Sequence, residues 1–234
     1  MKTRLFICVC ILFSLLSCSS SEKEQLETAL AFADTNRAEL EKVLEYYKND
    51  SLKLKAAIYL IENMPLYYTY KGSDLDSLHI ALEQYAVSDS YDKHLEYLKR
   101  FPYRNLFKEY DAKVITSEYL IENIEYSFKV WRETPWGKYV SFDNFCEFIL
   151  PYRIKDEPLT HWKKDFYHRF KPVLDSLYQG TDVVEATSCL SNYATSLHWK
   201  YQNELTGPHL SAQLLLELQL GDCTSIADFG CYML

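Results

Sequence analysis

The sequence predicts a mainly α-helical fold with a sizeable hydrophobic core. Apolar residues recur every three or four positions through most of residues 22–204, which is the period of an amphipathic helix. Only 6 glycines and 7 prolines occur, too few for a low-complexity or linker-rich chain. With 234 residues, of which 48% are hydrophobic, the chain is long enough for one or two compact domains.

The amino-terminal segment is typical of an export signal. Lys2 and Arg4 precede a run from Leu5 to Leu16 that is apolar except for one serine. This run is shorter than the roughly 20 residues that a membrane-spanning helix needs, so it is typical of the hydrophobic region of a signal peptide. It stops at Cys18, and the Leu-Leu-Ser-Cys ending resembles a bacterial lipobox, in which cleavage precedes the cysteine and its thiol carries lipid.

We therefore predict a lipoprotein signal peptide over residues 1–18 and a lipid on Cys18. Several acyl chains on one cysteine anchor a protein stably, so the expected location is the bacterial cell envelope, on the periplasmic or outer face of the outer membrane. The alternative is an ordinary secretory signal in which Cys18 has no role.

Helical spacing continues through the first half of the remaining chain. Asn36 is expected to cap a helix, with Glu39 completing a capping box three residues later. Tyr67–Gly72 interrupts the pattern and predicts a loop or a short extended segment. The helices expected in this half cover residues 22–33, 36–48, 51–64, 75–85, 89–99 and 116–131.

Further helices are expected beyond residue 140. Ser141 is expected to cap a helix that ends at Leu150, because Pro151 follows. Trp162, Phe166 and Phe170 recur at four-residue intervals and predict the next helix, which Pro172 kinks or ends. The clearest helical pattern covers 182–204 and stops before Gly207-Pro208, so residues 19–206 are expected to form one helical domain.

Charge and cysteine content exclude several classes of function. Residues 19–234 hold 23 basic and 33 acidic residues without a basic cluster, so nucleic acid is excluded as a partner. Four cysteines follow the signal, with no Cys-x-x-Cys pair and no zinc-finger histidines, so neither a metal site nor a cofactor is expected. Cys146 and Cys189 lie on apolar helix faces and are predicted to be small buried residues.

The end of the sequence has the pattern of a prepared thiol. A short helix capped by Ser211 is expected to reach Gly221, and Cys223 then begins a second helix. The positive end of a helix favours a thiolate, and its unpaired N–H groups can hold an oxyanion. A thiol nucleophile also needs a histidine base and a group that orients this base.

This segment resembles the active-site region of the transglutaminase-like, papain-type thiol proteins. Gly221-Asp222-Cys223, followed by Ala227 and Tyr232, is similar to the Gly-x-Cys turn that opens the family's core helix. Upstream, a run of short motifs resembles the helical region that precedes this core in lipoproteins of Bacteroidetes. The run reads Pro135-Trp136-Gly137-Lys138, Ser141-Phe142-Asp143-Asn144-Phe145, Ile149-Leu150-Pro151-Tyr152-Arg153, Glu157-Pro158-Leu159 and Trp162.

The resemblance implies that Cys223 is a nucleophile that attacks amide bonds in a protein or peptide, cell-wall peptide included. The family's histidine and aspartate follow the core helix, whereas all six histidines of this chain precede Cys223. Residues 207–234 are therefore expected to be the start of an incomplete α+β core, and the chain by itself to be inactive. We expect this stretch to be marginally ordered or to pack onto the helices before it.

A non-catalytic function is the alternative. The chain holds 20 tyrosines, and aromatic side chains in a groove can bind peptide or glycan. In that case the protein is a helical binding lipoprotein of the cell surface. Aromatic residues at helical spacing more often fill a core, which favours the thiol hypothesis.

Overall fold

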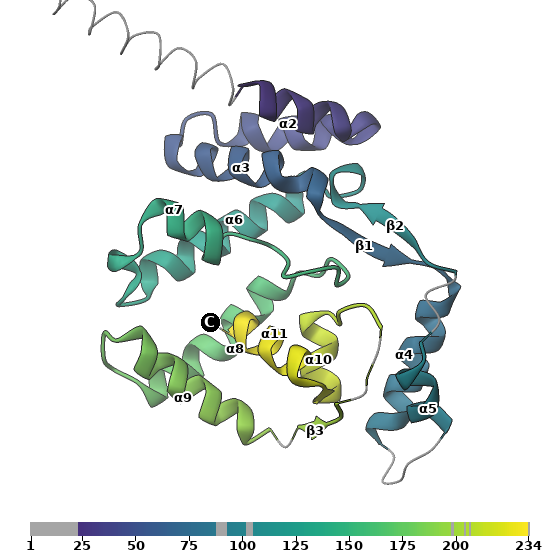
Figure 1. The fold of residues 1–234 in the computed structure, drawn as a ribbon. Coiled ribbons are helices and arrows are strands. Elements are labelled where there is room, and N and C mark those ends of the chain that lie inside the picture. Colours follow the sequence, from purple (N-terminus) through teal and green to yellow (C-terminus); the bar gives the residue numbers. More distant parts are fainter. Residues whose placement is uncertain are drawn as a thin grey trace, which may run out of the picture. The chain divides into compact units, whose positions relative to one another are not determined.

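The structure is a computed structural model that describes residues 23–87, 93–101, 105–197, 199–203, 205 and 207–233. It confirms that the protein is mainly helical (Figure 1). The chain forms two compact units. The first unit contains the described residues up to Tyr67 together with Tyr110–Ser117, and the second contains Tyr68–Glu109 and the residues from Glu118 onward.

The first unit is a small group of helices around an aliphatic core. Leu40, Val43 and Ile61 are fully buried in it. Asp50 caps one helix, because its carboxylate accepts hydrogen bonds from the backbone N–H groups of Leu52 and Lys53. In order, the elements are a helix over 23–32, η1 (Asp34–Asn36), α2 (Arg37–Tyr46), α3 (Ser51–Asn63), η2 (Met64–Leu66) and η4 (Asp111–Lys113).

The predicted capping box at Asn36 is wrong. Asn36 stands before α2, but its Nδ2 donates to the carbonyl oxygens of Ala112 and Ile115, at 3.0 and 2.9 Å. Glu39 accepts from the backbone N–H and the hydroxyl of Ser117, at 2.8 and 2.7 Å. Both side chains therefore bond to a distant part of the chain within the same unit, where a local pattern predicts partners three residues apart.

The second unit combines helices with two small sheets. Strands β1 and β2 form one sheet, which confirms the extended segment expected near Tyr68, and β3 and β4 pair in parallel in the other. In order, the elements are β1 (Tyr68–Lys71), α4 (Ser73–Ala86), α5 (Lys93–Lys99), β2 (Phe107–Tyr110), α6 (Ser117–Glu133), η5 (Gly137–Tyr139), α7 (Phe142–Asn144), the π-helix η6 (Phe145–Ile149), α8 (Trp162–Leu177), α9 (Val183–Thr195), β3 (Lys200–Tyr201), α10 (Ala212–Leu218), β4 (Leu220–Gly221) and α11 (Cys223–Met233).

Two predicted helices of the second unit differ from the structure. The helix expected over 182–204 ends at Thr195, and Tyr201 lies in β3 because the backbone there bonds to β4. Ser141 does cap a helix, accepting from Asn144 N at 3.2 Å, but the chain then widens into the π-helix η6. Of the two outcomes predicted for Pro172, the structure excludes the end of the helix, because α8 continues to Leu177.

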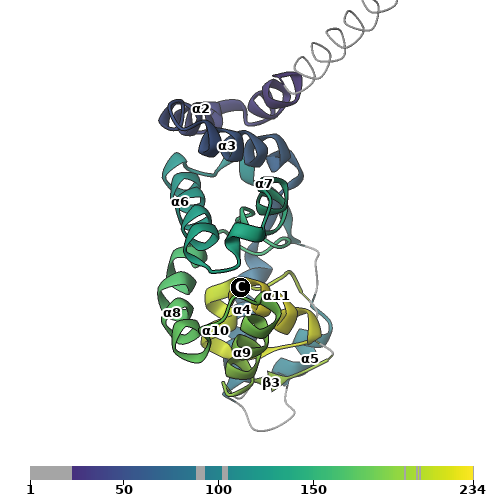
Figure 2. The same cartoon turned by 90° about the vertical axis from the view of Figure 1, so that its left-hand side faces the viewer.

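Helices α8 to α11 enclose one buried core of the second unit. Phe166 and Phe170 from α8, Leu215 from α10 and Phe229 and Tyr232 from α11 form one buried cluster. Figures 1 and 2 both show α11 lying against α8 and α10. The described part of 207–234 is therefore packed onto the preceding helices, the second of the two outcomes expected from the sequence. Within the described residues, no helix is both long and apolar enough to cross a bilayer.

Candidate functional site at the start of helix α11

The structure places Cys223 at the first residue of α11, with its side chain exposed. Asp222 caps this helix, since its Oδ1 accepts from the backbone N–H of Ser225 at 2.8 Å and from the Ser225 hydroxyl at 2.9 Å. The first helical hydrogen bond runs from Ile226 N to the Asp222 carbonyl oxygen. The thiol is therefore presented to solvent at the positive end of an 11-residue helix.

Gly221 allows the tight passage from β4 into α11. A Cβ atom at this position would lie only 2.3 Å from Cβ of Ser225, a distance that real Cβ atoms essentially never show. Any larger residue would have to push the start of α11 away from β4. The glycine two residues before the cysteine is therefore required by close packing.

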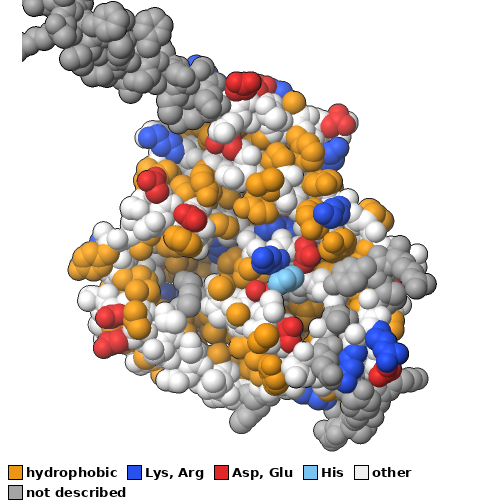
Figure 3. All heavy atoms as spheres, viewed as in Figure 1, with side chains coloured by type: hydrophobic (Ala, Val, Ile, Leu, Met, Phe, Trp, Pro, Cys, Tyr) orange, Lys and Arg blue, Asp and Glu red, His pale blue; other side chains and the backbone are white. Residues whose placement is uncertain are grey.

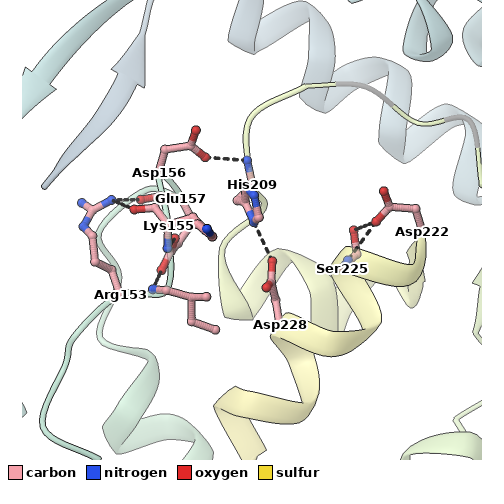
Figure 4. Close-up of polar contacts among 9 residues, drawn as sticks. Arg153, Lys155, Asp156, Glu157, His209, Asp222, Ser225 and Asp228 are labelled. Carbon is pink, nitrogen blue, oxygen red and sulfur yellow. Dashed lines mark hydrogen bonds and ion pairs between the residues drawn. The ribbon is translucent and has the colours of Figure 1, made fainter. Parts of the chain in front are cut away.

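His209 forms a partly buried pair with Asp228 of α11 that the sequence did not reveal. His209 Nδ1 lies 2.6 Å from Asp228 Oδ2, and the His209 backbone N–H donates to Asp156 Oδ1 at 2.9 Å (Figure 4). The hydrogen bond to Asp228 raises the pKa of His209, and partial burial of the ring opposes this rise. The pair therefore favours an imidazolium beside a carboxylate.

The loop after Tyr152 holds this arrangement in place. Arg153 Nη1 donates to the carbonyl oxygens of Tyr68 and Glu157, at 2.9 and 2.8 Å. The Glu157 carboxylate accepts from the backbone N–H groups of Ile154 and Lys155, at 2.6 and 2.8 Å, and closes the loop on itself (Figure 4). Arg153 and Glu157, from the Leu-Pro-Tyr-Arg and Glu-Pro-Leu motifs, thus stabilise a turn in which Asp156 accepts from the backbone of His209.

A pocket of about 220 Å³ adjoins the start of α11. Its apolar wall comes from Leu78 and Leu82 of α4 and from Leu205 and Leu210, and its polar wall contains His209, Asp222, Thr224 and Ser225. Cys223 does not line this pocket, although its two neighbours in sequence do. The thiol and the pocket therefore occupy different sides of the same helix end.

The other cysteines are less suited to chemistry. Cys146 is buried, and burial raises the pKa of its thiol to about 11, which agrees with the predicted structural role. Cys189 is half-buried, not fully buried as predicted. Cys231 is exposed, and desolvation followed by the Asp228 charge raises its pKa. None of these thiols is in a disulfide, and the described residues contain no group of three side chains suited to a metal ion.

Comparison of the chain with protein-family models, with curated proteins and with solved structures gives no match. The predicted lipidation site, Cys18, and the signal segment 1–18 lie outside the described residues.

On the face drawn in Figure 3, Lys and Arg side chains are interspersed with Asp and Glu.

Proposed function

We propose that this chain carries the nucleophile of an exported transglutaminase-like thiol enzyme. In this proposal a lipid on Cys18 anchors the protein in the bacterial cell envelope, and Cys223 attacks an amide bond of a protein or peptide. The observation that carries the proposal is the exposed position of Cys223 at the amino end of α11, directly after the tight turn at Gly221.

The chemistry would proceed through a thioester. The Cys223 thiolate adds to the amide carbonyl, and the backbone N–H groups at the start of α11 can stabilise the oxyanion. Collapse of the adduct breaks the carbon–nitrogen bond, and the amine leaves with a proton. Hydrolysis or attack by a second amine then releases the acyl group and regenerates the thiol.

The described residues do not supply the base for this reaction. Among the histidines whose side chains are described, namely His79, His161, His168 and His209, none forms a hydrogen bond with the Cys223 thiol, and His209 pairs with Asp228. By the resemblance, a histidine and an aspartate on strands beyond the thiol helix would complete the triad. We therefore propose a role for this chain as the carrier of the nucleophile.

The exposed face of α11 supports the same proposal. Ile226 is 41% exposed, Ala227 and Cys223 are exposed, and a Cβ on Gly230 would meet nothing within 4 Å. A helix with one buried face and an opposite, exposed face of apolar residues can pack against a further element. By the resemblance, the strands that carry the histidine and the aspartate would follow this helix.

The test is the rate at which Cys223 reacts with iodoacetamide, read by mass spectrometry of the Cys223 peptide. Cys231 is the matched control, because it lies on the same helix, is exposed and has a raised pKa. We expect Cys223 to react about tenfold faster than Cys231 near neutral pH, since a helix amino end favours the thiolate. Equal rates for the two thiols across the pH range would show that the proposal is wrong.

The alternative is a surface protein that binds peptide or glycan through its tyrosines, of which Tyr46, Tyr139 and Tyr201 are exposed. The conspicuous aromatic series of α8 is buried, with Phe166 and Phe170 each 2% exposed. These rings pack against Phe229 and Tyr232 of α11. They therefore contribute to the core of the second unit and do not line a groove.

A further inference from the structure

The pocket beside α11 combines an aliphatic wall with hydrogen-bonding groups of both kinds. Leu78 and Leu82 reach it from α4, and Leu205 and Leu210 reach it from the chain that precedes α10. Gly207 lies beside this wall, with a φ of +140°, and a Cβ there would lie 3.3 Å from Leu78 Cδ2. All residues that line the pocket belong to the second unit.

In the polar wall, His209 and Asp222 each keep one side-chain atom without a partner among the described residues, beside the hydroxyl groups of Thr224 and Ser225. His209 Nδ1 is engaged by Asp228, which favours the protonated ring, so Nε2–H is left as a donor with no partner among the described residues. Asp222 uses Oδ1 to cap α11, and in the described part of the chain Oδ2 has no partner. The pocket thus presents an N–H donor and a carboxylate acceptor beside four leucines.

A peptide group next to an aliphatic side chain matches this arrangement. Its carbonyl oxygen can accept from His209 Nε2–H, its N–H can donate to Asp222 Oδ2, and the side chain can leave water among the leucines. A free carboxylate or phosphate fits less well, because Asp222 would repel it.

We propose that this pocket binds an aliphatic residue of a peptide, held by His209 and Asp222 and by the leucine wall. The inference goes beyond the proposed thiol chemistry and does not depend on it, because Cys223 is not a lining residue. It assigns His209 and Asp222 to ligand binding and predicts a preference for leucine-like side chains over polar ones.

The experiment titrates N-acetyl-leucine methylamide into the full chain carrying Cys223→Ser, so that thiol reactivity plays no part. The readouts are the NMR signals of the His209 ring and of the Ser225 backbone N–H. We expect saturable shifts, and about tenfold weaker binding of N-acetyl-asparagine methylamide, because its side chain gains little from burial among leucines. No saturable shift, or equal binding of the two probes, overturns the proposal.

A pocket-filling variant gives a second, independent readout. Leu205→Trp places a large ring in the cavity and is expected to abolish the shifts of the leucine probe. Leu177→Trp is the matched control, because Leu177 is 50% exposed at the end of α8 and does not line the pocket. Unchanged binding in Leu205→Trp overturns the proposal, and the comparison of the two probes remains decisive if that variant does not fold.

Discussion

His209 Nδ1 lies 2.6 Å from Asp228 Oδ2, and this contact joins the segment before α10 to the middle of α11. The His209 side chain is 23% exposed and that of Asp228 is 10% exposed. A charge-assisted hydrogen bond of this kind is stronger than a neutral one and loses strength when the ring loses its proton.

The stability of the protein should therefore depend on pH through His209. Asp228 raises the pKa of His209 above 6.5, so the folded state binds the proton more tightly than the unfolded state does. This stabilisation is fully present below pH 6.5 and is lost as the pH rises through the higher pKa of the folded state. We expect His209→Gln to cost about 1–2 kcal/mol at about pH 6 and less at about pH 9, measured by urea unfolding. A cost that does not change with pH would contradict this assignment.

Lys163 is expected to stabilise the carboxyl end of the π-helix η6. Its Nζ donates to the carbonyl oxygens of Ile149 and Pro151, at 2.7 and 2.9 Å, and to the Ser127 hydroxyl at 2.7 Å. Lys163→Met would remove these three donated hydrogen bonds and leave Ile149 O with only the longer bond from the Ser127 hydroxyl, at 3.4 Å. We expect a loss of about 2–4 kcal/mol in unfolding experiments. A fully stable variant would show that the carbonyl groups find other partners.

Lys163 should also make the stability of the protein depend on pH. Its contribution should rise with pH, whereas that of His209 falls. Burial lowers the pKa of Lys163 well below 10.5, so the unfolded chain binds its proton more tightly than the folded protein. The contribution of Lys163 to stability is therefore smallest below the folded pKa and rises as the pH approaches 10.5. The difference in unfolding free energy between the natural protein and Lys163→Met should widen toward alkaline pH. A difference that narrows would contradict the lowered pKa.

The sequence predicted those parts of the fold that depend on local patterns. Helical spacing gave the mainly α fold, and short capping signals gave the starts of two helices, since Ser211 accepts from Leu214 N at 3.2 Å and Ser141 caps α7. The position of Cys223 at a helix start follows from the same kind of signal. Each of these features is decided by residues within a few positions of one another.

Features that depend on distant partners could not be predicted. Strand β3 has only two residues and exists because Lys200 N donates to Gln219 O and Gln202 N, directly after the strand, donates to Gly221 O. His209 and Asp228 are 19 residues apart and belong to different segments, so no spacing rule connects them. Asn36 and Glu39 formed a plausible local box, but partners from a much later part of the chain satisfy them. In each case the hydrogen-bond partner lies in a distant part of the sequence, which no local pattern specifies.

Glu157 is expected to hold the loop that supports His209. Its side chain is buried, with 2% exposed, and accepts hydrogen bonds from two backbone N–H groups. Glu157→Ala should therefore lower the free energy of unfolding by about 2–3 kcal/mol. Glu157→Gln should lower it less, because one acceptor oxygen remains. Thermal or urea unfolding measures both effects. Glu217→Ala, at an exposed position of α10, is the matched control and should change stability by no more than about 0.5 kcal/mol. If Glu157→Ala matches this control, the loop does not depend on the carboxylate.

Asp222 has two separable effects, one on α11 and one on the thiol beside it. Asp222→Ala removes the acceptor for Ser225 N and should destabilise the protein by about 1 kcal/mol, whereas Asp222→Asn keeps a capping oxygen and should be close to neutral.

The asparagine variant also removes a negative charge next to Cys223, and like charges repel a thiolate. We therefore expect iodoacetamide to react roughly two- to fivefold faster with Cys223 in Asp222→Asn at neutral pH, by mass spectrometry. An unchanged rate would mean that the exposed thiol is screened from its neighbour, and the helix end would then be the main influence on its reactivity.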